Sequence, residues 1–88
     1  MELTPRLKKI ADLIPRGSVV ADIGTDHAYL PAYCILNGIS TSAFAMDVNV
    51  GPLKSAENTV NQYGISRNVE LRLSDGIEKL SPGEADVI

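Results

Sequence analysis

The sequence contains few of the residue types that build metal centres and disulfide frameworks. Among its 88 residues there is one cysteine and one histidine, and tryptophan is absent. A single cysteine excludes an intrachain disulfide framework and any metal site made of cysteines alone. A lone histidine also disfavours a histidine-based metal centre, so we predict no metal site. One phenylalanine and three tyrosines leave few large side chains for a core.

Long apolar runs and a secretion signal are missing as well. No stretch approaches the roughly 18 apolar residues of a membrane-spanning helix. The first nine residues carry lysine and arginine without the apolar segment of a signal peptide. Eleven acidic against eight basic residues give a net charge of −3, which is unlike a nucleic-acid-binding surface. We therefore expect a cytoplasmic globular protein without a membrane partner.

Apolar strand-like segments alternate with helix-like segments along the chain. Short β-branched or apolar runs predict buried strands, and apolar residues at helical spacing predict helices between them. This alternation is typical of a parallel sheet with right-handed crossovers, so we expect an α/β, Rossmann-like fold with flanking helices. Because the last residues open a fourth strand, we expect a domain truncated after about four strands. The expected helices are 4–14, 28–37, 52–63 and a short turn at 77–80; the strands are 18–23, 42–47, 69–73 and 85–88.

An aspartate stands at or just after the end of each of the first three expected strands. These are Asp22, Asp47 and Asp75. In open α/β sheets, ligands bind beyond the carboxyl ends of the strands. Three carboxylates there suit a ligand rich in hydroxyl groups, amines or positive charge.

The loop after the first strand does not fit a phosphate. A dinucleotide fold requires G-x-G-x-x-G, whereas here Gly24 stands alone and Asp26 would bring negative charge to the site. No Gly-Lys-Ser/Thr sequence of a Walker loop occurs. This loop therefore argues against a nicotinamide-dependent oxidoreductase, which shares the fold, and favours a ligand with an amino or sulfonium group.

The second and third acids suggest an adenosine. Asp47, 23 positions after Gly24, is placed to accept hydrogen bonds from two ribose hydroxyls. Val48 can pack on the adenine, and Asp75 can accept from the adenine amine or simply cap a helix. Together with Asp22, these residues predict S-adenosylmethionine as the cofactor.

The stretch Val20-Ala-Asp-Ile-Gly-Thr-Asp-His-Ala-Tyr-Leu-Pro31 resembles motif I of the bacterial tRNA (adenine-22-N1)-methyltransferase family. Asp26 and Ala28 replace the second and third glycines of the generic class I methyltransferase motif, a departure that characterises this family. Three further segments agree: Leu3-Thr-Pro-Arg-Leu7 with Ile14-Pro15; Gly51-Pro52 with Ser55-Ala56 and Asn58; and Leu71-Arg-Leu-Ser-Asp-Gly76.

The resemblance implies a cofactor-binding half of a class I methyltransferase domain over residues 1–88, with tRNA as the partner and N1 of an adenine as the acceptor. It leaves the catalytic residues unknown. His27 could line the methionine end of the cofactor or form a surface turn with Asp26, and Arg6 could meet the cofactor carboxylate or be an ordinary exposed side chain. The cofactor-binding residues it implies are Asp22, Gly24, Asp26, His27, Asp47, Val48, Asp75 and Gly76.

An alternative function stays open beside this one. The chain could be a non-catalytic fragment that binds S-adenosylmethionine or forms a dimer. With its length, we expect the chain alone to be inactive and its exposed sheet edge to be covered by a second copy, hence a possible homodimer. Because the chain is acidic, much of the basic surface for tRNA should belong to other parts of the protein.

Overall fold

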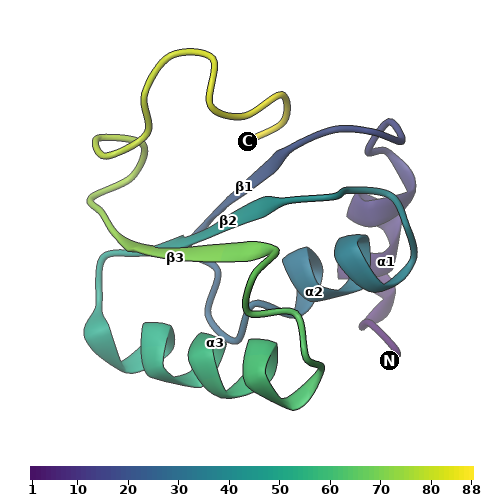
Figure 1. The fold of residues 1–88 in the computed structure, drawn as a ribbon, viewed down its shortest axis with the longest axis horizontal. Helices are drawn as coiled ribbons and strands as arrows, with labels where there is room; N and C mark the ends of the chain where they lie inside the picture. The colour runs from purple at the N-terminus through teal and green to yellow at the C-terminus, as the bar shows by residue number, and fades with distance from the viewer.

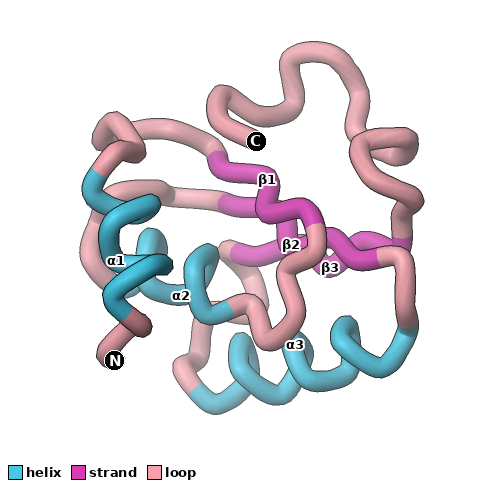
Figure 2. The backbone as a smooth tube through the Cα atoms, turned by 180° about the vertical axis from the view of Figure 1, so that it is seen from behind, coloured by secondary structure: helices cyan, strands magenta, loops and turns pink.

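The computed structural model describes residues 1–88 as one parallel sheet with three helices on one face (Figure 1). The residues after the last strand run along the opposite face, as the views from both sides show (Figures 1 and 2). In chain order the elements are α1 (Pro5–Asp12), β1 (Val20–Ile23), α2 (Tyr29–Leu36), β2 (Ala43–Asp47), α3 (Val50–Gln62) and β3 (Val69–Leu73).

The strands lie side by side in the order β1-β2-β3, all parallel. The register aligns Val20 with Ala43 and Ala43 with Val69. On the outer side of β1, Val87 forms an isolated parallel bridge with Val20. The chain therefore leaves the sheet at β3 and returns beside β1. The order of strand pairing reverses next to β1, where α/β sheets place their ligands.

Local sequence accounts for the start of the first helix. The Thr4 hydroxyl accepts a hydrogen bond from the Leu7 amide at 3.4 Å, and Pro5 occupies the first helical position, where its missing N–H group costs no hydrogen bond. Lys8 and Asp12 form an ion pair one turn apart on the exposed face. The buried face of this helix packs through Ala11 against α2.

Small side chains dominate the core between the sheet and the helices. One cluster joins α2, α3, β2 and β3, and another joins α1 and α2 to the start of β1 and β2. Small residues let the helices approach the sheet closely, and this compensates for the scarcity of aromatic residues. The alanines that are fully buried in the first cluster are Ala28, Ala32, Ala45 and Ala56.

The α/β fold class is confirmed, and the three predicted long helices and the first three strands are present with ends that differ by at most two residues. One expectation is wrong in detail, because the fourth strand is reduced to the Val87 bridge. The short turn expected at 77–80 is present as hydrogen-bonded turns over residues 76–79. The Ser74 hydroxyl accepts from the Lys79 amide, and this hydrogen bond holds the turn after β3.

Arg72 holds the chain after β3 against the far face of the sheet. Its guanidinium donates to the carboxylates of Glu70 and Glu84 and to the Lys79 carbonyl, and it lies 4.6 Å from the centre of the Phe44 ring. These bonds use every N–H group of the side chain. One arginine therefore fixes the path of residues 74–84.

Candidate functional site

The loop between β1 and α2 adopts a backbone that side chains rarely permit. Asp26 and Ala28 both have φ of +59°, and they are the two residues other than glycine with positive φ. Gly24 has φ of +69° as well. A left-handed residue other than glycine costs roughly 1–2 kcal/mol, somewhat less for aspartate. The loop is therefore a strained segment, of the kind that concentrates at functional sites.

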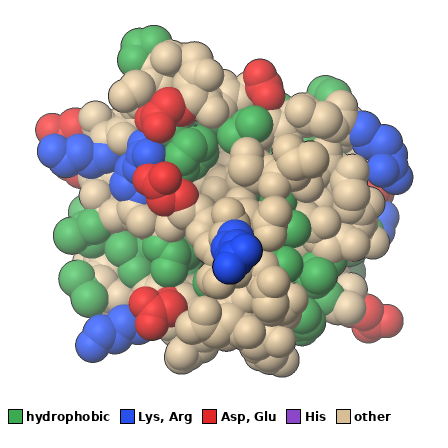
Figure 3. Space-filling model, in the orientation of Figure 1, with side chains coloured by type: hydrophobic (Ala, Val, Ile, Leu, Met, Phe, Trp, Pro, Cys, Tyr) green, Lys and Arg blue, Asp and Glu red, His purple; other side chains and the backbone are tan.

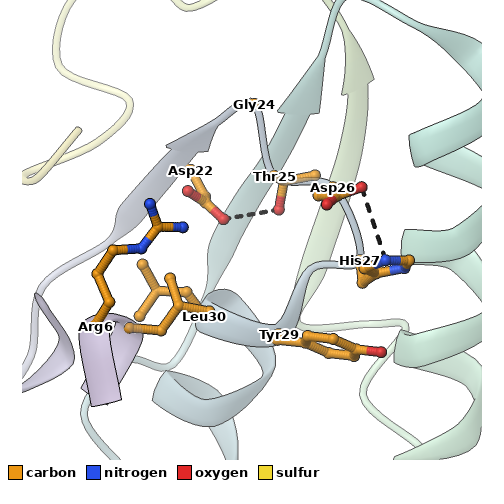
Figure 4. A pocket seen from close by; sticks show the side chains of 9 residues that line it. Arg6, Asp22, Gly24, Thr25, Asp26, His27, Tyr29 and Leu30 are labelled. Carbon is orange, nitrogen blue, oxygen red and sulfur yellow. Dashed lines mark hydrogen bonds and ion pairs between the residues drawn. The ribbon is translucent and has the colours of Figure 1, made fainter. Parts of the chain in front are cut away.

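This loop forms one wall of a hollow of about 170 Å³ (Figure 4). The opposite wall comes from α1, through Arg6 and Leu7. Four of the predicted cofactor-binding residues line it: Asp22, Gly24, Asp26 and His27. A Cβ atom built on Gly24 would meet no atom within 4 Å, so the glycine leaves open space and serves the backbone conformation. The remaining lining residues are Thr25, Tyr29 and Leu30.

Asp22 is the acid at the centre of the hollow. The Thr25 hydroxyl donates to its Oδ2 at 2.8 Å, whereas its Oδ1 has no hydrogen-bond partner in the protein. Burial raises the pKa of this carboxyl above its usual value; the Thr25 hydrogen bond opposes the shift and the nearby charge of Asp47 adds to it. A carboxylate with one free oxygen, partly removed from water, is well suited to bind a cation.

His27 and Tyr29 form the outer rim. Their rings stack with centres 5.0 Å apart, and the Nε2 atom of His27 lies 3.8 Å from Oδ1 of Asp26 (Figure 4). All three side chains are largely exposed. The hypothesis of a surface turn pair for Asp26 and His27 therefore describes part of the geometry, although both residues also line the hollow.

Asp47 lies outside the hollow, at the adjoining edge of the sheet. It is 8% exposed, and its oxygens accept from the backbone amides of Asn49 at 3.0 Å and Asp26 at 3.4 Å. Its carbonyl accepts from the Ser74 amide at 2.9 Å. Asp47 thus ties together the ends of all three strands, and it keeps spare acceptor capacity because each carboxylate oxygen can accept two hydrogen bonds.

The predicted adenine contacts lie at the same edge but do not line the hollow. Val48 is 59% exposed after β2. Asp75 and Gly76 are exposed after β3, and Gly76 has φ of +58°. Ser74, and not Asp75, makes the capping bonds there, donating to the Gly76 carbonyl and accepting from Lys79. This capping leaves the Asp75 carboxylate without a hydrogen-bond partner.

Sequence reasoning missed two parts of this site. Thr25 and Ser74 are buried polar residues that hold Asp22 and the turn after β3, and neither was selected. The signal for Thr25 was its position three residues after Asp22, a spacing at which a hydroxyl can reach back to a carboxylate across a turn.

Other reactive side chains contribute no second centre. Cys34 is fully buried on α2, and burial, assisted by the charge of Asp22, raises the pKa of its thiol to about 11. A thiol of this kind is neutral at pH 7 and a poor nucleophile. No three histidine, cysteine, aspartate or glutamate side chains are arranged to hold a metal ion, and none of the helices has the length and apolarity to cross a membrane.

Residues 3–88 match the sequence profile of a methyltransferase domain. The chain belongs to this methyltransferase domain family. Its strand order and its strained loop after β1 are consequently features of a methyltransferase domain, and Asp26 and Ala28 stand where the generic motif of the resemblance has glycines. The positive φ of both residues explains that motif, because the backbone there takes a conformation that glycine adopts without strain.

A curated relative and several solved structures show which methyltransferases this chain is similar to. The tRNA (adenine(22)-N(1))-methyltransferase of Bacillus subtilis is 43% identical over the whole chain, and its TrmK crystal structure superposes with a TM-score of 0.92 over 98% of the chain. TrmK of M. capricolum, in complex with S-adenosyl-homocysteine, is 39% identical with a TM-score of 0.88 over 96% of the chain. A Streptococcus pneumoniae putative tRNA (m1A22) methyltransferase, in complex with S-adenosyl-L-methionine, is 32% identical with a TM-score of 0.86 over 91% of the chain.

The match covers a limited share of these proteins. The chain spans 37% of the length of the Bacillus subtilis relative, and the same share of the M. capricolum and Streptococcus pneumoniae structures. Along the 88 residues of this chain, the 43% identity confirms the resemblance to the tRNA (adenine-22-N1)-methyltransferases.

Proposed function

We propose that this chain is the cofactor-binding part of an S-adenosylmethionine-dependent methyltransferase that acts on N1 of an adenine in tRNA. The observation that carries the proposal is the juxtaposition of Asp22, Gly24 and Asp47 at one edge of the sheet in a chain 43% identical to a tRNA (adenine(22)-N(1))-methyltransferase. The solved relatives in complex with S-adenosylmethionine and S-adenosyl-homocysteine support the choice of cofactor.

The donor set of the site fits this cofactor. Asp22 offers its free Oδ1 to an ammonium group, and Gly24 leaves the backbone open to approach. Asp47 keeps acceptor capacity for ribose hydroxyls, and the exposed Val48 provides an apolar surface for a base. Asp75 has an unengaged carboxylate that can accept from an exocyclic amine. The loop keeps only Gly24 of the glycine-rich turn that lets a pyrophosphate approach the backbone, and Asp26 adds negative charge there, which disfavours the nicotinamide alternative.

The bound cofactor would supply a methyl group on a sulfonium, open to direct displacement by the adenine nitrogen. The residues of this chain then have a positioning task. Asp47 and Asp75 fix the nucleoside end, Asp22 fixes the amino-acid end, and the rigid loop between β1 and α2 holds the two at a constant separation. Such alignment supplies much of the rate of a displacement that needs no covalent intermediate.

We propose that the main contacts to tRNA lie outside these 88 residues. Acidic and basic side chains are interspersed over the face in Figure 3, where phosphate contacts would favour a continuous basic surface. The local basic residues near the N-terminus are also partly engaged: Lys8 pairs with Asp12, and Arg16 donates to the Gly38 carbonyl.

We propose, as a second candidate, that the part of the β1 edge beyond the Val87 bridge pairs with a second copy of the chain. Beyond the Val87 bridge, this edge is bordered by an apolar groove whose wall includes Ile10, Ile14 and Ile88. Light scattering after size-exclusion chromatography tests this proposal. A dimer whose fraction grows with protein concentration supports it, and a chain that stays monomeric when its concentration is raised 100-fold overturns it.

A chimera tests the activity directly. The chain replaces the matching residues of the Bacillus subtilis relative, and the product is incubated with a tRNA transcript and methyl-labelled S-adenosylmethionine. We expect label at N1 of an adenine, lost when Asp22 and Asp47 are both changed to alanine. A folded chimera that binds the cofactor and leaves every tRNA unlabelled refutes the tRNA proposal, and titration of the 88-residue chain with S-adenosyl-homocysteine tests cofactor binding separately.

A further inference from the structure

Residues 75–85 follow β3 across the face of the sheet opposite the helices, and one side chain attaches them to the strands (Figure 1). Before this segment the Ser74 amide donates to the Asp47 carbonyl at 2.9 Å, and after it the Asp86 amide donates to the loop before β1 at 2.8 Å. The backbone hydrogen bonds between these two points join the segment only to itself. Every hydrogen bond from residues 75–85 to a strand is made by the guanidinium of Arg72.

Arg72 is itself held in one orientation. Its Nε and Nη2 atoms donate to the carboxylate of Glu70, two residues earlier on the same strand, and its guanidinium lies 4.6 Å from the centre of the Phe44 ring on β2. The side chain is 19% exposed. A guanidinium that is paired with a carboxylate and stacked on an aromatic ring loses little further conformational entropy when it forms more hydrogen bonds. Arg72 therefore presents fixed donors to the segment that passes over it.

These donors reach two turns of the segment. Nη1 of Arg72 donates to the Lys79 carbonyl at 2.7 Å, while the Lys79 amide donates to the Ser74 hydroxyl at 3.1 Å, so both backbone groups of Lys79 are held. Nη1 and Nη2 also donate to the two carboxylate oxygens of Glu84 at 2.8 and 3.1 Å, the paired geometry that makes such bonds strong. Oε1 of Glu84 accepts from the Ser81 amide at 2.6 Å, which closes the second turn. Because the hydrogen bonds from Arg72 lower the pKa of Glu84 to about 2, the ion pair is complete at neutral pH.

Asp75 lies within the first of these turns and has no other support. Its carbonyl accepts from the Glu78 amide at 3.2 Å inside the turn, and its exposed carboxylate makes no hydrogen bond to the protein. The backbone of the turn therefore sets the position of that carboxylate. An N–H···O hydrogen bond spans about 2.7–3.2 Å, so a displacement of the turn by about 1 Å is enough to lose a bond from a ligand to Asp75.

We infer that Arg72, through its bonds to Lys79 and Glu84, is a positioning residue for the base end of the bound nucleoside. It holds Asp75 where the carboxylate accepts from an exocyclic amine. The inference rests on the proposed function, which supplies the ligand and the role of Asp75. It adds that a side chain on the opposite face of the sheet, which does not line the hollow, decides whether the amine is recognised. Arg72 thus controls the selectivity for the base and contributes little to the affinity for the rest of the cofactor.

Calorimetric titration of the 88-residue chain tests this with two ligands. One is S-adenosyl-homocysteine, and the other is its analogue whose base is unsubstituted purine, which lacks only the exocyclic amine. We expect the wild-type chain to bind the adenine ligand at least about tenfold more tightly, the factor that a hydrogen bond to a charged group supplies. Asp75→Ala removes the acceptor and should bring the two affinities within about twofold of each other.

Arg72→Gln and Glu84→Gln leave Asp75 in place and release the turn that carries it. Glutamine has a single amide NH2 group in place of the guanidinium, and it can accept through only one of the two terminal atoms that accept in glutamate. We expect both variants to prefer the adenine ligand by at most about threefold, with the loss of affinity falling on that ligand. A purely structural role would weaken the binding of both ligands equally. Adding Asp75→Ala to Arg72→Gln should reduce the preference no further than Asp75→Ala does alone, because both changes act on one contact.

Arg16→Gln and Asp86→Asn are the matched controls. Arg16 also donates to a backbone carbonyl, that of Gly38 in the loop after α2, and Asp86 accepts from the Val19 amide just beyond the end of the same segment. Both controls should keep the wild-type preference for the adenine ligand, even where they lower the stability of the chain.

An unchanged preference in either Arg72→Gln or Glu84→Gln, or an equal loss in the controls, overturns the positioning role and leaves the proposed function intact. A wild-type chain that binds both ligands equally also overturns it, because Asp75 then recognises no amine. If neither ligand binds the folded wild-type chain, cofactor binding is refuted together with the inference. Far-ultraviolet circular dichroism shows which variants are folded, and Glu84→Gln decides the question alone if Arg72→Gln is unfolded.

Discussion

The backbone amide of Asp26 donates to the carboxylate of Asp47 at 3.4 Å, across 21 residues of sequence. This hydrogen bond joins the loop after β1 to the end of β2. Because Asp47 also accepts from the Asn49 amide, one buried carboxylate organises two neighbouring loops. The residue that we propose to bind ribose is therefore also part of the structure of its own site.

Asp47→Asn separates these two roles. The variant keeps one carbonyl oxygen and replaces the other with an amide NH2 group, which cannot accept from a backbone amide, so we expect the free energy of unfolding to fall by about 1 kcal/mol. We expect affinity for S-adenosyl-homocysteine to fall at least tenfold, because a ribose acceptor is lost. Urea denaturation and calorimetry measure the two effects.

Asp86→Asn is the control for that change. Asp86 accepts from the Val19 amide at 2.8 Å, near the opposite end of β1 from the hollow. It should show a comparable loss of stability with unchanged affinity. An equal loss of affinity in both variants would mean that Asp47 acts through stability alone.

Asp22→Asn should raise the stability of the chain and weaken its binding of the cofactor. The pKa of Asp22 is raised in the folded chain, so the protonated form is favoured there, and its contribution to stability is present below the ordinary carboxyl pKa and lost as the pH rises through the raised value. Asparagine is neutral at every pH and can still accept from Thr25. We therefore expect the urea midpoint of Asp22→Asn, relative to wild type, to increase between pH 4 and pH 7.

The same variant should bind S-adenosyl-homocysteine at least tenfold more weakly, because the ammonium loses its charged partner. A stability difference that stays constant with pH would contradict the proposed burial of this carboxylate. Unchanged binding would contradict its role in the hollow.

Glu84→Gln should lower the stability of the chain at neutral pH and leave it unchanged at acid pH, whereas Asp22→Asn should raise it at neutral pH. The hydrogen bond from Arg72 lowers the pKa of Glu84 to about 2, so its contribution is present above the ordinary glutamate pKa near 4.5 and is lost as the pH falls toward 2. We expect the melting temperature of Glu84→Gln to lie below wild type at pH 7 and to converge with it near pH 2. Glu57→Gln, on the exposed face of α3, should follow the wild type at every pH.

Asp26→Gly and Asp26→Val compare backbone conformations directly, because the Asp26 side chain is largely exposed. At φ of +59° we expect the glycine variant to be more stable than the valine variant by about 1–2 kcal/mol. At Glu57, inside α3, the order should reverse, since glycine is the poorer helix residue. Urea denaturation of the four variants measures both differences. The same order at both positions would show that the loop is not held in the left-handed conformation.

The alternation of apolar runs and helical spacing determined the fold class and the three long helices, because these patterns depend on neighbours within a few residues. The same local reasoning placed an aspartate at each strand end and singled out the loop after β1. It failed for residues 85–88, where the expected strand is reduced to the bridge between Val87 and Val20. The pairing of these residues depends on β1, which lies far away in the sequence, and no local pattern contains that contact.

The tertiary structure alone decided which acids share a space. Asp22 and Asp26 line one hollow with Arg6, whereas Asp47 and Asp75 lie beside it, although all four stand at or near the carboxyl ends of strands. Arg6 comes from a helix that precedes the first strand by several residues, and its place opposite Asp22 results from the packing of α1 against α2. Sequence spacing decides which charged side chains each helix or strand carries, and the packing of the helices and strands decides which of these side chains come together.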